Sequence, residues 1–217
     1  MTLYLFPFVK SFLFSVFATL FLIWLYNKIP WKIKAKLKNR LGSRHIHSFK
    51  VSRFGGVAII SAFIFAILRD PNLFISQPLW GIILACGIIL VVGIIDDFHE
   101  LDWKTQLSFQ FIIAVLVFIM GVRVDFITNP LGGYIFLNLG KYVIPSLIFV
   151  IIWIALIINS VNWLDGIDGL SGGVAFIAAM TIFFLSLKPE VNQPPMGIIT
   201  MSLVGALLGF LIFNFYF

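Results

Sequence analysis

The sequence predicts an all-α membrane protein, a polytopic bundle of about seven transmembrane helices with a small β-hairpin on its outer face. Of its 217 residues, 61% are hydrophobic and 11% are charged. A soluble domain is about half apolar and a quarter charged. Several apolar runs meet or approach the roughly 17 to 25 residues that a helix needs to cross a bilayer. With a single cysteine, one chain cannot form a disulfide or a thiolate zinc site.

The apolar runs place the spans along the chain. The first run is longer than a signal-peptide core and lacks a basic start and a small-residue cleavage site, so we expect a retained anchor. In the last run, Gly205 and Gly209 have the spacing of small residues at a close helix contact. The expected spans are 3–27, 54–69, 79–95, 105–121, 143–160, 170–187 and 197–213.

The basic residues predict the orientation. Nine of the fifteen lysines and arginines fall within residues 28–53. Because basic loops stay in the cytoplasm, we expect this segment inside and the amino terminus outside. The same charges would also attract anionic lipid headgroups. Counting spans then puts 96–104 and 160–169 in the cytoplasm and 122–142 outside.

The outer segment 122–142 alternates apolar and polar residues around an Asn-Pro and a Gly-Gly pair. This pattern predicts a small β-hairpin. The chain has no repeat of fixed period, no low-complexity tract and no linker. We therefore expect one integral membrane domain over residues 1–217.

The acidic residues gather on the cytoplasmic face. Six of the nine lie in its two short loops: Asp96, Asp97, Glu100, Asp102, Asp165 and Asp168. Simple solvation of loop ends would scatter such residues over both faces. Their clustering beside a polybasic segment predicts a site for phosphates and a divalent cation.

Asp96 and Asp97 end the third expected span, and Lys104 opens the next. Two crowded carboxylates need a metal ion, a lysine or a shared proton. One of them could bind magnesium while its neighbour orients or deprotonates an attacking phosphate. The alternative is a helix end that is merely solvated by acids.

The stretch "NSVNWLDGIDGLSGG" places Asn159 and Asn162, and then Asp165 and Asp168, three residues apart. If the aspartates open the next helix, they project to one side of its first turn. The glycine after each aspartate would let a ligand approach the backbone, and a helix amino terminus favours phosphate. The alternative is capping of two helix ends, although capping needs one such residue per end.

These polar groups are mostly oxygen donors, which suit magnesium better than zinc. Upstream, Arg53 precedes Gly55 and Gly56, so its guanidinium could hold a phosphate at the membrane surface. His45 and His47 lie in the same basic segment, where a solvated side chain is the simpler interpretation.

Three motifs in order resemble those of the polyprenyl-phosphate N-acetylhexosamine-1-phosphate transferases, integral membrane enzymes that start bacterial cell-envelope glycan synthesis. "HSFKVSRFGG" is similar to the first cytoplasmic element of this family. "DDFHELDWK" resembles its aspartate-pair loop, and "NSVNWLDGIDGLSGG" resembles its signature. The wording "NWLDGIDGL" is closer to the N-acetylglucosamine-1-phosphate branch than to the branch acting on muramyl-pentapeptide.

The resemblance implies a magnesium-dependent phosphoglycosyltransferase of the bacterial inner membrane. It would transfer N-acetylglucosamine 1-phosphate from a UDP-sugar to undecaprenyl phosphate on the cytoplasmic face and release UMP, as in cell-wall or lipopolysaccharide biosynthesis. Expected partners are both substrates and the lipid bilayer; a second copy of the chain is left open, and no nucleic acid is expected.

The resemblance also implies roles for individual residues. Asp96 and Asp97 would be catalytic and handle the lipid phosphate and the metal, and Asn162 with Asp97 would hold magnesium. The implied substrate-binding residues are His47, Arg53, Lys104, Asn159, Asp165 and Asp168.

The family pattern continues beyond this chain, through further spans, a Gly-Asp-x-Gly-Ser loop and a histidine-rich loop. We therefore expect an N-terminal portion of a longer fold, truncated at its carboxyl end. The open alternatives are an inactive fragment of the transferase, and a membrane transporter or lipid scramblase. A transporter predicts polar residues within the spans, whereas here they gather at the cytoplasmic ends.

Overall fold

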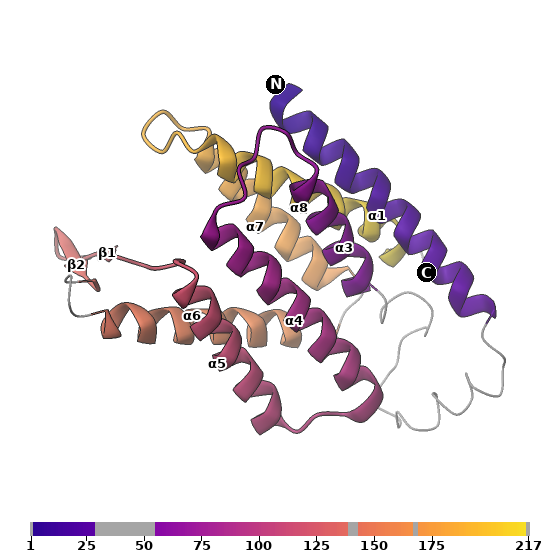
Figure 1. Cartoon of the computed structure of the whole chain (residues 1–217), viewed down its shortest axis with the longest axis horizontal. Helices are drawn as coiled ribbons and strands as arrows, with labels where there is room; N and C mark the ends of the chain where they lie inside the picture. Colours follow the sequence, from indigo (N-terminus) through magenta and orange to yellow (C-terminus); the bar gives the residue numbers. More distant parts are fainter. Residues whose placement is uncertain (1, 29–54, 139–142, 167–168, 216–217) are drawn as a thin grey trace. The chain divides into compact units, whose positions relative to one another are not determined.

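The computed structural model describes residues 2–28, 55–138, 143–166 and 169–215, without the side chains of residues 97 and 98. Over these ranges the chain forms seven helices and one two-stranded sheet (Figure 1). Four of the helices are long and apolar enough to cross a membrane, and three are shorter apolar helices. The predicted class, a polytopic helical membrane protein with a small hairpin, is confirmed.

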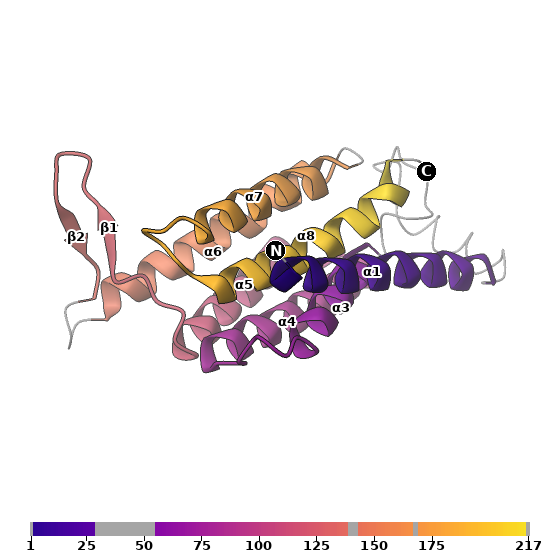
Figure 2. The same ribbon diagram turned by 90° about the horizontal axis from the view of Figure 1, so that it is seen from above.

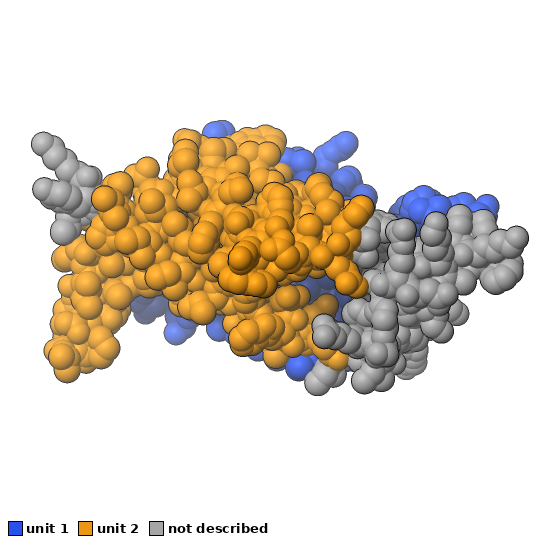
Figure 3. Space-filling view, turned by 90° about the horizontal axis from the view of Figure 1, so that it is seen from below, with its two compact units in different colours: residues 1–74, 167–217 blue, residues 75–166 orange. Residues whose placement is uncertain are grey.

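The chain divides into two compact units, drawn in blue and orange in Figure 3. The first unit comprises residues 1–74 and 167–217, and the second comprises residues 75–166. The expectation of a single integral membrane domain stays a prediction.

The first unit is built around its last helix. It contains α1 (Thr2–Lys28), α3 (Gly55–Leu68), α7 (Leu170–Ser186) and α8 (Pro194–Asn214). In the most apolar stretch of α8, 61% of the residues are buried, whereas in that of α1 the share is 17%. Helix α8 packs against the other three helices and lies between α1 and α7 in Figure 2. The central position of α8 explains why its apolar surface is covered by protein.

Small residues let α1 and α8 approach closely. A Cβ atom on Gly205 would overlap Ser11 Oγ and the carbonyl oxygen of Phe8, and one on Gly209 would lie 2.7 Å from the carbonyl oxygen of Phe12. The packing role predicted for both glycines is confirmed. Ser15 Oγ donates a hydrogen bond of 2.7 Å to the carbonyl oxygen of Ala206 across this contact.

The second unit contains α4 (Gln77–His99), α5 (Trp103–Ile119), the strands β1 (Phe126–Thr128) and β2 (Tyr134–Phe136), and α6 (Ile144–Leu164). Helix α5 packs against both α4 and α6. A proline stands in the first turn of both α4 and α6, where its missing N–H removes no helical bond. The fourth expected span ran to residue 121, but α5 ends at Ile119, and Gly121 adopts a φ of 99°.

The predicted hairpin is confirmed as an antiparallel pair with Phe126 opposite Phe136 and Thr128 opposite Tyr134. The buried Ser146 at the start of α6 ties down its base. Ser146 Oγ donates to the carbonyl oxygen of Val124 at 2.8 Å and accepts from its amide at 3.2 Å. The base of the hairpin is thereby joined to the first turn of α6.

Candidate active site

The turn between α4 and α5 is organised by Asp96. Helix α4 ends at His99, and Glu100 turns the chain with a left-handed φ of 45°. The carbonyl oxygen of Asp96 accepts from the Glu100 amide at 2.9 Å, and its carboxylate Oδ1 accepts from the Leu101 amide at 2.7 Å. The half-buried carboxylate is therefore held at the end of α4 instead of being simply solvated.

A second group on α5 holds the same carboxylate oxygen. Gln106 Nε2 donates to Asp96 Oδ1 at 3.0 Å and to the carbonyl oxygen of Leu101 at 3.2 Å. Asp96 thus receives bonds from the turn and from the first turns of the next helix. Gln106 was not among the residues predicted from the sequence.

The polar contacts continue along α5 to α6. Gln110 lies four residues after Gln106, on the same helix face, and is 8% exposed. Asn159 Nδ2 donates to Gln110 Oε1 at 2.7 Å and to the carbonyl oxygen of Ala155 at 2.7 Å, and Gln110 Nε2 donates to Asn159 Oδ1 at 3.4 Å. We call Asp96, Gln106, Gln110 and Asn159 the polar ladder.

The ladder had a signal in the sequence. Gln106 and Gln110 recur at helical spacing inside an expected span, and polar side chains in a membrane segment need a partner. Their partners are distant in the chain, so the spacing alone would have predicted the polar face but not the residues it contacts.

Asn162 and Asp165 lie at the end of α6, and both are exposed. The helix runs to Leu164, and Asp165 caps it, with its amide 3.4 Å from the carbonyl oxygen of Asn162. Of the two interpretations left open for Asp165, capping of a helix end is the one the structure shows, because α7 begins only at Leu170. Asp168 lies outside the described residues.

The glycines of this motif differ in their surroundings. Gly169 precedes α7 with a φ of 76°, and a Cβ atom there would overlap the ring of Phe215. At Gly172 a Cβ atom would lie 2.8 Å from Leu211. These two glycines therefore make room for α8. A Cβ atom on Gly166 or on Gly173 would meet nothing within 4 Å, so the backbone beside Asp165 has room for a ligand to approach.

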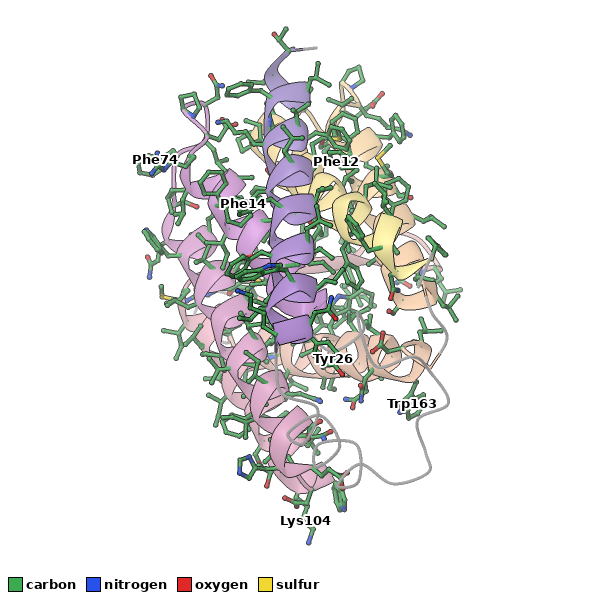
Figure 4. The ribbon with its side chains drawn as sticks, turned by 90° about the vertical axis from the view of Figure 1, so that its right-hand side faces the viewer. Phe12, Phe14, Tyr26, Phe74, Lys104 and Trp163 are labelled. Carbon is green, nitrogen blue, oxygen red and sulfur yellow. The ribbon has the colours of Figure 1, made fainter. Side chains whose placement is uncertain are left out.

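Lys104 stands at the start of α5 and is exposed, with its side chain projecting away from the ribbon in Figure 4. Its ammonium nitrogen lies 5.6 Å from the centre of the Trp103 ring. Asp102 lies two residues before Lys104, and its carboxylate accepts a hydrogen bond from the Thr105 hydroxyl. This bond lowers the pKa of the Asp102 carboxyl below its usual value. The turn therefore carries an acidic and a basic side chain two residues apart in the sequence.

Six predicted site residues belong to residues 75–166: Asp96, Asp97, Lys104, Asn159, Asn162 and Asp165. Asp97 lies in the last turns of α4, but its side chain is not described. His47 and Arg53, like Asp168, fall outside the described residues.

The donor chemistry of these residues fits magnesium. Asp96, Asn162 and Asp165 carry carboxylate and amide oxygens, which magnesium prefers over nitrogen or sulfur. Among the described residues, no three His, Cys, Asp or Glu side chains gather closely enough to hold a metal ion.

The described helices are apolar, which defines a polytopic membrane protein. Their polar groups lie at helix ends and on the polar ladder, and the candidate site residues stand at the ends of α4 and α6. The family model described as glycosyl transferase family 4 matches residues 79–217. The chain belongs to that family.

Three relatives illustrate the similarity. A probable undecaprenyl-phosphate N-acetylglucosaminyl 1-phosphate transferase of Bacillus subtilis is 29% identical over 96% of this chain and 56% of its own length. A decaprenyl-phosphate N-acetylglucosaminephosphotransferase of Mycolicibacterium smegmatis is 31% identical over 80% of this chain and 45% of its own. A phospho-N-acetylmuramoyl-pentapeptide-transferase of Thermoanaerobacter is 30% identical over 86% and 61%. The chain spans about half the length of these relatives.

Proposed function

We propose that this protein is a phosphoglycosyltransferase that moves a sugar 1-phosphate from a UDP-sugar to undecaprenyl phosphate and releases UMP. The observation that carries the proposal is the acidic pair at the end of α4, with Asp96 held by Gln106 and Leu101, in a chain of glycosyl transferase family 4. The names of the relatives support the same reaction class.

In the proposed reaction, an oxygen of the lipid phosphate attacks the sugar-bearing phosphorus of the UDP-sugar. A new phosphorus–oxygen bond forms, the bond to UMP breaks, and UMP leaves with the bonding electrons. Such a step depends on positioning and on charge neutralisation. The proposal assigns to Asp97 the orientation or deprotonation of the attacking phosphate, beside the held carboxylate of Asp96.

Basic groups would bind the lipid phosphate, with Lys104 at the start of α5 and His47 and Arg53 upstream. Asn159, Asp165 and Asp168 would hold the nucleotide. Asp97 and Asn162 would hold magnesium, and the chemistry that a bound magnesium ion supplies is neutralisation of charge on the diphosphate. The site would face the cytoplasm of a bacterial inner membrane, beside the polybasic segment.

N-acetylglucosamine 1-phosphate is the group we propose for transfer, in cell-wall or lipopolysaccharide biosynthesis. The relatives in Bacillus and Mycolicibacterium carry N-acetylglucosamine in their names, whereas the one in Thermoanaerobacter is named for a muramoyl-pentapeptide. An assay with both UDP-sugars decides between the two.

The contact between the Gln110 and Asn159 side chains, within the described helices, does not favour the transporter alternative. Gln110 and Asn159 bond to each other between α5 and α6. Groups that satisfy each other at a helix contact do not need a water-filled path.

The test is exchange of labelled UMP into UDP-N-acetylglucosamine by membrane vesicles, with and without magnesium. This chain is compared with a version extended by the remaining segment of the Bacillus relative. We expect magnesium-dependent exchange that falls at least about 100-fold in Asp97→Asn, because an essential general base or positioning group is typically worth two or more decades. Asp96→Asn, whose amide oxygen can still accept from Gln106, should keep the fold and lose rate.

Glu190→Gln, on the exposed loop before α8, serves as the matched control and should leave the exchange unchanged. No exchange by the extended version, or full exchange after Asp97→Asn, would overturn the proposal.

A further inference from the structure

The hairpin carries an unusual amount of exposed apolar surface. Residues 126–138 include no charged side chain, and the nearest charges are Arg123 and Asp125 at the base. Leu131 at the tip is 96% exposed, and Tyr134 and Phe136 are 61% and 58% exposed. A hairpin surrounded by water would be expected to carry charged residues on its outer face.

Both faces of the hairpin are apolar. The strand register places Phe126, Tyr134 and Phe136 on one face, which we call the aromatic face, and Ile127 and Ile135 on the other. The Phe126 ring centre lies 5.0 Å from that of Tyr134 and 6.3 Å from that of Phe136. An isolated two-stranded hairpin is marginally stable in water, so this one needs a further apolar environment.

The hairpin is held firmly at its base. Leu137 and Asn138 donate their amides to the carbonyl oxygen of Asp125 at 2.8 and 3.1 Å. The Asn138 side chain donates to Asp125 Oδ1 at 2.8 Å. With the bonds between Ser146 and Val124, these contacts tie the base to the start of α6.

That start is one end of a candidate membrane span. In Figure 2 the hairpin runs across the axis of α6 instead of continuing it. If α6 crosses the bilayer, the hairpin lies along the membrane surface, tied to the end of α6 at which Ile144 is exposed.

We propose that the aromatic face is a lipid-binding surface that rests in the interfacial layer of the outer leaflet. Three observations point to lipid: the hairpin base is tied to the end of a candidate membrane span, no charged side chain falls within residues 126–138, and tyrosine joins phenylalanine on the face. Tyrosine is enriched at the boundary between headgroups and acyl chains, where one end of the ring is apolar and the other is wet. The hairpin would thereby fix the depth of α5 and α6 in the membrane.

The test is the depth of a spin label on the whole chain in phosphatidylethanolamine–phosphatidylglycerol nanodiscs. Cys86→Ser removes the only native thiol. Single cysteines are then placed at Leu131, at Tyr134 and, as a control, at Glu190. Power saturation compares the accessibility of each label to oxygen, which partitions into lipid, and to a water-soluble nickel chelate.

We expect the labels at positions 131 and 134 to be several-fold more accessible to oxygen than to nickel, and the label at 190 to show the reverse. Leu131 is almost fully exposed, so its substitution should leave the fold intact even if that of Tyr134 does not. High nickel accessibility at both hairpin positions would overturn the proposal in favour of a solvated hairpin. Low accessibility to both reagents would overturn it in favour of a second copy of the chain covering the face.

Discussion

At the scale of single residues, buried hydroxyls on α1 differ in whether they have a partner. Ser15 Oγ bonds to Ala206, whereas Thr19 Oγ1 is buried without a hydrogen-bond partner among the described residues. A partnered polar group stabilises a helix contact, and an unpartnered one is a net cost. Removing these two hydroxyls of α1 should therefore have opposite effects on the free energy of unfolding.

We expect Ser15→Ala to lower the free energy of unfolding by about 0.6 kcal/mol, up to ~1.7, the range for hydrogen bonds between membrane helices. Thr19→Val, which keeps the shape and removes the hydroxyl, should be neutral or stabilising. Reversible unfolding in mixed micelles measures both. Equal losses in the two variants would mean that the assigned bond is not what distinguishes them.

Gly205 is a second single-residue test. Its missing Cβ leaves room for the backbone of α1 at Phe8, so Gly205→Ala must push the two helices apart. We expect a loss of about 1 to 3 kcal/mol, typical of overpacking. Gly87→Ala on α4 is the control, since nothing lies within 4 Å of a Cβ atom there. A Gly205→Ala variant as stable as the control would contradict the close approach.

At the scale of elements, the polar ladder joins three helices. Asp96 and Gln106 connect α4 to α5, and Gln110 and Asn159 connect α5 to α6. The candidate site residues therefore sit on helices whose relative positions depend on the amides of Gln106 and Gln110, which carry no proposed chemistry. Loss of these amides should disturb the site from a distance.

A double-mutant cycle tests the α5–α6 link. Gln110→Ala and Asn159→Ala should each destabilise the protein, and together they should show a coupling energy of about 0.6 kcal/mol, up to ~1.7. Ser108→Ala with Asn159→Ala is the control cycle, because among the described residues Ser108 Oγ donates within α5, to the carbonyl oxygen of Lys104 at 2.8 Å. Coupling in the control cycle as large as in the test cycle would rule out a specific link.

At the scale of the whole molecule, the charge distribution predicts which loops face each side of the membrane. His99 ends α4 at the predicted cytoplasmic face, and Glu190 precedes α8 at the predicted outer face; both are exposed. In the Cys86→Ser background, a cysteine at Glu190 should react with an impermeant maleimide in intact cells. A cysteine at His99 should react only after permeabilisation. The reverse pattern would invert the topology and place the proposed site outside.

Much of the architecture could be predicted from the sequence. The seven helices of the described residues fall where the apolar runs place them, and the hairpin forms around the Asn-Pro and Gly-Gly pairs. The site was harder to predict. For Asp165 the sequence left open the first turn of the next helix and the cap of a helix end, because polar residues at either end of a helix give the same local pattern. The structure shows that it caps the end of α6.

By itself, the sequence determined the membrane class, the order of the apolar helices and the small hairpin, since hydrophobic run length and turn residues act locally. Only the tertiary structure decided which polar groups meet. Gln106 reaches Asp96 ten residues away, and Gln110 reaches Asn159 forty-nine residues away. A hydrogen bond depends on how helices pack against each other, and the spacing of residues within one helix does not contain that information.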